Sequence, residues 1–247
     1  MAIPFSPAQL VAAARQYGTP LWCYDAATIQ ARIAQLQAFD VVRYAQKASS
    51  NLHLLRLIRE AGVRVDAVSL GEIERALLAG FSPVDAGIVF TCDLFDEATL
   101  ARVVELQVEV NTGSIDMLRQ LGEKSPGHRV WLRINPGFGH GHSRKTNTGG
   151  ENSKHGIWHD QMSEALAVIR QHGLHLVGLH MHIGSGVDYD HLEQVGAAMV
   201  AAVKSLDHDL EAFSIGGGLS TPYREGDTPV DVQRYANAWK VARQEIE

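Results

Sequence analysis

The sequence predicts an α/β protein whose strands form a parallel (β/α)₈ barrel of the TIM type. Short β-branched runs alternate with longer amphipathic runs from about residue 40 onward, and strict alternation of this kind produces a parallel sheet. The predicted strands are short and evenly spaced, and polar or glycine-rich motifs follow nearly every one. A barrel keeps its active site at the carboxyl ends of its strands, whereas a doubly wound sheet concentrates its motifs near one switch point. The pattern therefore favours the barrel.

Periodicity and capping residues place the elements. Gly62 and Gly80 are plausible helix stops, and Asp96 is a good N-cap for the helix that follows it. In chain order the predicted strands are 41–44, 63–68, 88–90, 108–110, 129–134, 176–183 and 210–215. The predicted helices are 52–60, 71–79, the helix after residue 96, 114–121, 161–172, 190–206 and 231–247.

The strand count leaves the barrel one unit short. Seven strand–helix units follow residue 40, whereas a closed barrel needs eight, and an open sheet leaves two unpaired edges. The last residues continue a helical pattern without a capping signal. We therefore expect the chain to stop before the eighth strand. The run 20–24 is also strand-like, but it precedes the barrel and has no obvious partner.

Composition indicates an ordinary globular protein. The chain has 247 residues, 45% of them hydrophobic and 20% charged, with a net charge of −6. Its basic residues form no run, so nucleic acid is not an expected partner and an anionic cofactor must be held by local donors. Cys23 and Cys92 suit neither a disulfide framework nor a zinc cluster. Because no signal peptide or long apolar run is found, we expect a cytoplasmic protein that does not associate with membranes.

Lys47 is the first candidate for chemistry, because Tyr44-Ala-Gln-Lys47 ends the first barrel strand. A lysine there would stand at the catalytic mouth beside apolar strand. Partial burial disfavours the charged form of an amine, and a less protonated amine can form a Schiff base. The alternative is a strand-end lysine that simply reaches solvent.

Two later motifs could hold an anion and a flat ring. Gly216, Gly217 and Gly218 follow the seventh strand, where backbone N–H groups can approach a phosphate, unless the glycines only form a tight turn. His180 and His182 are two residues apart, so they project to one side of the strand. They could ligate a metal, sit in the core, or place one imidazole against an aromatic ring while Ser185 contacts a phosphate. Because no convincing set of further ligands follows, no metal is predicted.

Two acidic residues lie near the end of the second predicted strand. Asp66 could pair with Lys47 across adjacent strands. Glu72 lies near the start of a helix, where a negative charge is also favourable without any catalytic role. The long polar loop 135–156 is of a kind that is usually functional or mobile, and its glycine pattern does not follow the dinucleotide fingerprint.

Together these segments resemble the fold-type III pyridoxal-phosphate decarboxylases, and within them the diaminopimelate decarboxylase family. The resemblance is carried by Tyr44-Ala-Gln-Lys47, Val68-Ser-Leu-Gly-Glu-Ile-Glu74, the stretch Arg133 to Trp158, His180-Met-His-Ile-Gly-Ser-Gly186 and Gly216-Gly-Gly-Leu219. It spans essentially the whole chain, and it implies a barrel of the alanine racemase and group IV decarboxylase type.

The resemblance implies specific roles in binding pyridoxal 5′-phosphate. Lys47 would be the catalytic Schiff-base lysine, and His182 would stack on the pyridine ring. Ser185 and the three glycines Gly216, Gly217 and Gly218 would contact the phosphate. The remaining implied cofactor-pocket residues are Asp66, near Lys47, and Glu72, Arg133 and His155.

The chain also departs from the family, whose members continue further. They carry a Glu-Pro-Gly-Arg motif, then a β-domain with a Cys-Glu-Ser-Gly-Asp motif, and neither motif is present here. The resemblance thus implies that residues 1–25 carry a strand that joins the absent β-domain, and that 26–247 form an incomplete barrel domain.

The implied activity is decarboxylation of meso-2,6-diaminopimelate to L-lysine by a homodimer, with the isolated chain inactive. The alternatives are decarboxylation of another basic amino acid, a non-catalytic pyridoxal-phosphate carrier, and a metal-dependent barrel hydrolase.

Overall fold

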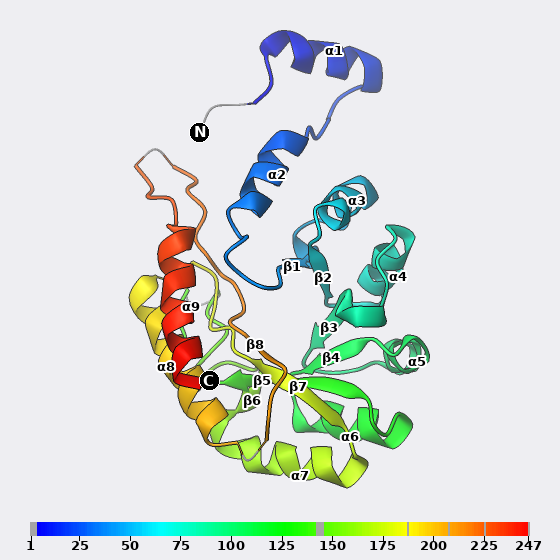
Figure 1. Ribbon diagram of the computed structural model, residues 1–247. Helices are drawn as coiled ribbons and strands as arrows, with labels where there is room; N and C mark the ends of the chain where they lie inside the picture. The colour runs from blue at the N-terminus through cyan, green and yellow to red at the C-terminus, as the bar shows by residue number, and fades with distance from the viewer. Residues whose placement is uncertain (1–3, 142–145, 187, 207, 225, 247) are drawn as a thin grey trace.

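The computed structural model describes residues 4–141, 146–186, 188–206, 208–224 and 226–246. Its centre is a parallel sheet whose strands follow one another in chain order, except that the short β6 pairs only with β5. Helices surround the strands on the outside (Figure 1). The predicted α/β barrel architecture is confirmed, in an open form. The strands are β1 (Arg43–Ala45), β2 (Arg64–Ala67), β3 (Ile88–Cys92), β4 (Glu109–Thr112), β5 (Arg129–Asn135), β6 (Ile157–Trp158), β7 (His175–His180) and β8 (Ala212–Ser214).

The helices begin where the sequence offers a short polar cap. Asn51, Ser69, Asp96, Ser114 and Asp188 each accept a hydrogen bond from a backbone N–H of the helix that follows, which satisfies donors that a helix start leaves open. The helices of the barrel are α3 (Leu52–Glu60), α4 (Leu70–Leu78), α5 (Glu97–Leu106), α6 (Ile115–Lys124), α7 (Met162–His172), α8 (Tyr189–Lys204) and α9 (Val232–Ile246).

Two helices that the sequence analysis did not predict precede the barrel, α1 (Pro7–Tyr17) and α2 (Ala26–Ala34). Ser6 and Gln9 form a capping box at the start of α1, which is a signal readable in the sequence. Both helices lack buried residues, and Figure 1 shows α1 away from the strands. The run 20–24 is not a strand here, because it has no hydrogen-bonding neighbour among the described strands.

The strand β6 was also missed by the sequence analysis. Its two residues extend the end of β5, where Ile134 pairs with Ile157 and Asn135 with Trp158. A strand of two residues is too short to show alternation, so periodicity could not find it. Its pairing anchors the returning end of the long loop 135–156 beside the carboxyl end of β5.

The first and last barrel strands are not paired with each other among the described residues. Side chains cross the gap instead. The ring of Phe39, just before β1, lies 5.8 Å from the ring of Tyr235 on α9. Asp40 accepts a hydrogen bond of 3.1 Å from Arg243. Helix α9 therefore covers the open side of the barrel next to β8.

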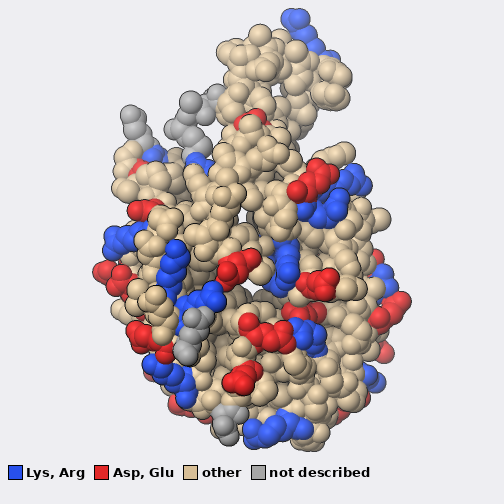
Figure 2. All heavy atoms as spheres, viewed as in Figure 1, with Lys and Arg blue, Asp and Glu red and all other residues tan. Residues whose placement is uncertain are grey.

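The surface carries both signs of charge. On the face shown in Figure 2, acidic and basic side chains are interspersed, while the segment around α1 is mostly uncharged. No helix among the described residues is long and apolar enough to cross a membrane.

Candidate functional site

Lys47 lies where β1 ends, in the short 3₁₀-helix Gln46–Ala48. Ala45, two residues before the lysine, pairs with Asp66 on β2, so the lysine stands at the carboxyl edge of the sheet as predicted. The partial burial expected for Lys47 is wrong, since its side chain is exposed. The residue before it, Gln46, is fully buried and donates to the backbone oxygen of Glu72 at 2.8 Å.

Asp66 is partly buried and accepts a hydrogen bond of 2.5 Å from the hydroxyl of Thr91 on β3. Burial raises the pKa of Asp66 to about 6, although the Thr91 hydrogen bond and the positive charges of Arg43, Lys47 and Arg133 act in the opposite direction. Lys47 is thus near enough to act on Asp66 electrostatically. Among the described residues, Lys47 and Asp66 form no ion pair. The two charged groups are therefore farther apart than the predicted pairing requires.

Glu72 serves the start of α4. Its carboxylate accepts a hydrogen bond of 2.8 Å from the backbone N–H of Val68, and its own N–H donates to the hydroxyl of Ser69. These contacts support the interpretation in which Glu72 stabilises the start of the helix. They also fix the turn that leads from β2 to α4, next to Gln46 and Lys47.

Arg133 and His155 meet at Asp93, which the sequence analysis missed. The Arg133 guanidinium lies 3.9 Å from one Asp93 oxygen, and His155 Nδ1 contacts the other. Arg133 is only 8% exposed, and burial lowers its pKa. The position of Asp93, directly after β3, was the signal that could have identified it. The expected neighbours Arg133 and His155 are therefore brought together by a shared carboxylate.

His182 and the three glycines form one cradle. The backbone N–H of Gly217 donates to His182 Nδ1 at 3.2 Å. A methyl group on Gly216 would lie 2.8 Å from the His182 ring, whereas one on Gly217 would meet nothing within 4 Å. Burial lowers the pKa of His182 to about 4, with the charge of Arg133 adding to the effect. The cradle therefore offers a neutral flat ring beside open space lined by backbone.

Ser185 stands on the rim of the same cradle. The backbone N–H of Ser185 donates to the backbone oxygen of Thr146 at 3.1 Å. The backbone N–H of Gly186 donates to the backbone oxygen of Gly218 at 2.8 Å. Thr148 donates its hydroxyl proton to the oxygen of His182 at 3.2 Å. The described part of the long loop is thus tied to the segment after β7. Residues 142–145 of that loop lie outside the described residues.

The two histidines were expected on one side of the same strand, but the strand ends between them. His180 is the last residue of β7, and the ring of His182 lies 6.5 Å away, edge-on. Neither belongs to the only group of three possible metal ligands among the described residues, His140, Asp188 and His191. The described residues therefore do not bring His180 and His182 together with the third ligand that the metal-dependent hydrolase alternative needs.

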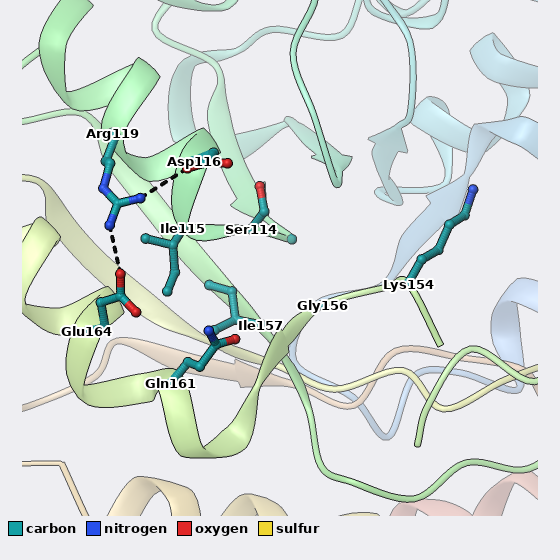
Figure 3. Close-up of a pocket in the computed structure, with 10 residues that line it drawn as sticks. Ser114, Ile115, Asp116, Arg119, Lys154, Gly156, Ile157, Gln161 and Glu164 are labelled. Atoms are coloured by element: carbon teal, nitrogen blue, oxygen red, sulfur yellow. Dashed lines mark hydrogen bonds and ion pairs between the residues drawn. The ribbon is translucent and has the colours of Figure 1, made fainter. Parts of the chain in front are cut away.

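A separate hollow lies between the starts of α6 and α7 (Figure 3). Its volume is about 330 Å³, and its lining includes Ser114, Lys154 and Gln161. Arg119 forms one wall by bridging Asp116 and Glu164. The hollow borders the loop that carries His155, but Lys47 and the glycine cradle are not among its lining residues.

Comparison with known proteins shows which family has this arrangement. The family model described as "Pyridoxal-dependent decarboxylase, pyridoxal binding domain" matches residues 26–247. The chain belongs to this family. Diaminopimelate decarboxylase of Streptomyces coelicolor is 63% identical over 240 residues, which are 96% of this chain and 54% of that protein. The enzyme of Escherichia coli K12 is 63% identical over 94% of this chain and 56% of its own length.

Solved structures agree with the pyridoxal binding domain. A crystal structure of diaminopimelate decarboxylase matches with a TM-score of 0.93 and 61% identity, over 97% of this chain and 57% of that one. The Helicobacter pylori enzyme, complexed with L-lysine, matches with a TM-score of 0.88 and 28% identity, over 95% of this chain and 63% of that one. The chain spans about half the length of the curated relatives it matches.

Proposed function

We propose that the protein decarboxylates meso-2,6-diaminopimelate to L-lysine and CO₂, and that this chain supplies its pyridoxal-phosphate site. The observation that carries the proposal is the convergence of Lys47, His182 and the glycine cradle at one end of the sheet, in a chain 63% identical to diaminopimelate decarboxylases. The substrate is the part that rests on the relatives alone.

The residues fit the cofactor. Lys47 extends an exposed amine from the end of β1, where it can bond to an aldehyde carbon. The neutral ring of His182 can lie against the pyridine face, because an uncharged imidazole can be desolvated at little cost. The open space beside Gly217 can take a phosphate, with the close-packed Gly216 and Gly218 on either side of it and Ser185 at the rim.

The other charged residues orient the site and hold protons. Arg133, fixed by Asp93, supplies a buried positive charge, and His155 lies against the same carboxylate. Asp66 sits between Lys47 and Thr91 and can stabilise positive charge beside the lysine. Glu72 shapes the turn behind Lys47. Bound pyridoxal phosphate supplies the electron sink that accepts the electron pair left by departing CO₂.

The remaining proposals concern assembly. We propose that residues 26–247 form the cofactor-binding domain and that residues 1–25 pack against a further domain of a cytoplasmic homodimer. The support is the exposure of large apolar side chains in that first segment: Trp22 is 85% exposed and Tyr17 70%. Apolar groups gathered in this way commonly mark a contact surface.

Borohydride trapping tests the cofactor assignment. The chain is mixed with pyridoxal 5′-phosphate, reduced, digested and mapped by mass spectrometry. We expect the pyridoxyl group on the peptide that contains Lys47 and its loss in Lys47→Ala. Lys154→Ala is the matched control, since it removes another exposed lysine, one that lines the separate hollow. Labelling that persists unchanged in Lys47→Ala would contradict the assignment.

A second assay tests the substrate. CO₂ release from meso-2,6-diaminopimelate, L-ornithine and L-arginine is measured with the chain and with a form extended to the length of its relatives. We expect release from diaminopimelate by the extended form and little by the chain alone. Preference for ornithine or arginine would replace the proposed substrate, and trapping at Lys47 without any release would indicate a carrier.

A further inference from the structure

A line of hydrogen bonds crosses the interior of the barrel from β2 to β7. The hydroxyl of Thr91 donates to Asp66 at 2.5 Å, and the side-chain amide of Asn111 donates to the Thr91 oxygen at 3.2 Å. The same amide nitrogen contacts Nδ1 of His180. These four residues lie on four strands, β2, β3, β4 and β7, and their side chains meet near the carboxyl edge. Neither Asn111 nor His180 is among the residues assigned above.

The number of available protons sets the direction of every bond in this line. A threonine hydroxyl has a single proton, and here the Asp66 carboxylate takes it, so the Thr91 oxygen must accept from Asn111. The amide NH₂ has two protons, of which the second points to His180 Nδ1. That nitrogen is therefore the acceptor. Burial lowers the pKa of His180 well below its ordinary value, so the ring is neutral and its proton lies on Nε2.

The line ends in two buried polar atoms. Nε2 of His180 and Oδ1 of Asn111 have no hydrogen-bond partner among the described residues. Leaving a buried donor unsatisfied is costly, and proteins retain such groups mainly where a ligand completes them. His180 is close enough to Arg133, His182 and Lys47 for their charges to act on it. A donor in positively charged surroundings suits an oxygen acceptor that carries negative charge.

We propose that His180, held in its Nε2–H form by Asn111, is a further cofactor-binding residue that donates a hydrogen bond to an oxygen of pyridoxal 5′-phosphate. The inference rests on the proposed function for its ligand. The tautomer of His180 follows from the protein alone. Asn111 is a positioning residue, since it acts on the ligand only through His180.

Nuclear magnetic resonance tests the tautomer without any substitution. Two-bond ¹⁵N–¹H correlation spectra of the chain labelled at histidine distinguish Nε2–H from Nδ1–H, and His180→Gln assigns the signal. We expect the neutral Nε2–H form at neutral pH in the cofactor-free chain. A signal from the Nδ1–H form, or from the charged ring, would overturn the inference.

Cofactor affinity tests the ligand. Dissociation constants for pyridoxal 5′-phosphate are measured by visible absorption for His180→Phe and His180→Gln. The phenylalanine keeps a ring but has no donor, so we expect affinity to fall roughly ten- to hundredfold. Glutamine restores an N–H near the Nε2 position and should recover most of it. The control is His175→Phe, because His175 begins the same strand at its other end.

The outcomes separate this inference from the proposed function. Unchanged affinity in His180→Phe, with trapping at Lys47 intact, would overturn the role of His180 and leave the cofactor site standing. Failure of the unaltered chain to bind pyridoxal 5′-phosphate at all would overturn both. Circular dichroism melting of each variant shows whether a lost affinity reflects a lost fold.

Discussion

The two ends of the sheet treat their charged and polar groups in opposite ways. At the amino end, Arg129 begins β5 and donates to Glu109 at 2.6 Å and to Glu211 at 2.9 and 2.8 Å. Trp131 donates to the second oxygen of Glu109, and His175 contacts Glu211 at 2.5 Å. The polar groups of this cluster find their partners inside the protein.

At the carboxyl end, buried polar atoms are left over. Gln46 Oε1, Asn111 Oδ1 and His180 Nε2 have no hydrogen-bond partner among the described residues. The pKa values of two groups at this end are also shifted, since burial raises the pKa of Asp66 to about 6 and lowers that of His182 to about 4. Barrel enzymes use their amino end for stability and their carboxyl end for chemistry. By this contrast, the paired side chains at the amino end serve stability, and the side chains with unsatisfied atoms at the carboxyl end serve chemistry.

The largest effect on stability is expected at Glu109. Glu109→Ala removes a carboxylate that is 3% exposed and leaves the indole N–H of Trp131 without its acceptor. We expect a loss of about 3 kcal/mol in the free energy of unfolding, because breaking a buried pair strands the remaining groups. Urea denaturation of the cofactor-free chain measures it.

The control for Glu109 is Glu105→Ala, which breaks an exposed pair with Arg102 on α5 and should cost under about 1 kcal/mol. Near-equal losses in the two variants would remove the distinction between a buried and an exposed pair. A Glu109 variant that stays folded but binds pyridoxal 5′-phosphate much more weakly would break the division between the two ends.

A smaller loss, combined with weakened binding, is expected at Gly216. Its φ of +68° belongs to the left-handed region, and an added methyl group would lie 2.7 Å from the oxygen of Met181. We expect Gly216→Ala to cost about 2 kcal/mol and to weaken cofactor binding, because the ring of His182 must move. Thermal melting and absorption titration measure the two effects.

Gly217→Ala is the matched control, since a methyl group there meets no protein atom within 4 Å. It should leave the melting temperature of the cofactor-free chain unchanged. If it also leaves cofactor affinity unchanged, the open space beside Gly217 does not hold the phosphate.

The sequence predicted the barrel and most of its mouth for a general reason. Carboxyl ends of parallel strands share one edge, so motifs that follow strands must converge. The position of Lys47, Asp66 and the cradle glycines at this edge was predicted this way. The exposure of Lys47 was not, because a residue just past a strand end lies outside the alternation from which burial is predicted.

Pairings between distant strands were also beyond the sequence. Asn111 and His180 are 69 residues apart, and their contact depends on the strand order, in which β5 alone separates β4 from β7. The predicted strand 108–110 ended before Asn111, which the structure places inside the buried strand β4. No pattern in the sequence singled out Asn111 or the residue that it contacts.

Asp66 provides the next test, through pH. Its pKa in the folded chain is about 6, above the ordinary value of 3.8, so the folded state binds more protons between these values. The contribution of Asp66 to stability is therefore fully present below about pH 4 and is lost as the pH rises through 6. Asp66→Asn removes this dependence.

We expect Asp66→Asn to gain about 1 to 2 kcal/mol relative to the unaltered chain between about pH 4 and pH 7.5. Urea denaturation at both pH values, without cofactor, measures the difference. Other carboxylates are common to both proteins and cancel in the comparison. A difference that does not change with pH would mean that Asp66 is not destabilised by burial.

The smallest effect is expected at Glu211, which completes the amino-end cluster from its exposed side. Its side chain is 50% exposed, and hydrogen bonds from Arg129 lower its pKa to about 2. A carboxylate whose pKa is lowered on folding stabilises the folded state above its ordinary pKa of about 4.5. That stabilisation is lost as the pH falls toward 2. Glu211→Gln should therefore cost under about 1 kcal/mol at neutral pH and less in high salt, because water and ions screen an exposed pair. Glu123→Gln, an exposed glutamate on α6, is the control. A loss as large as that of Glu109→Ala would show that the whole cluster acts as one buried unit.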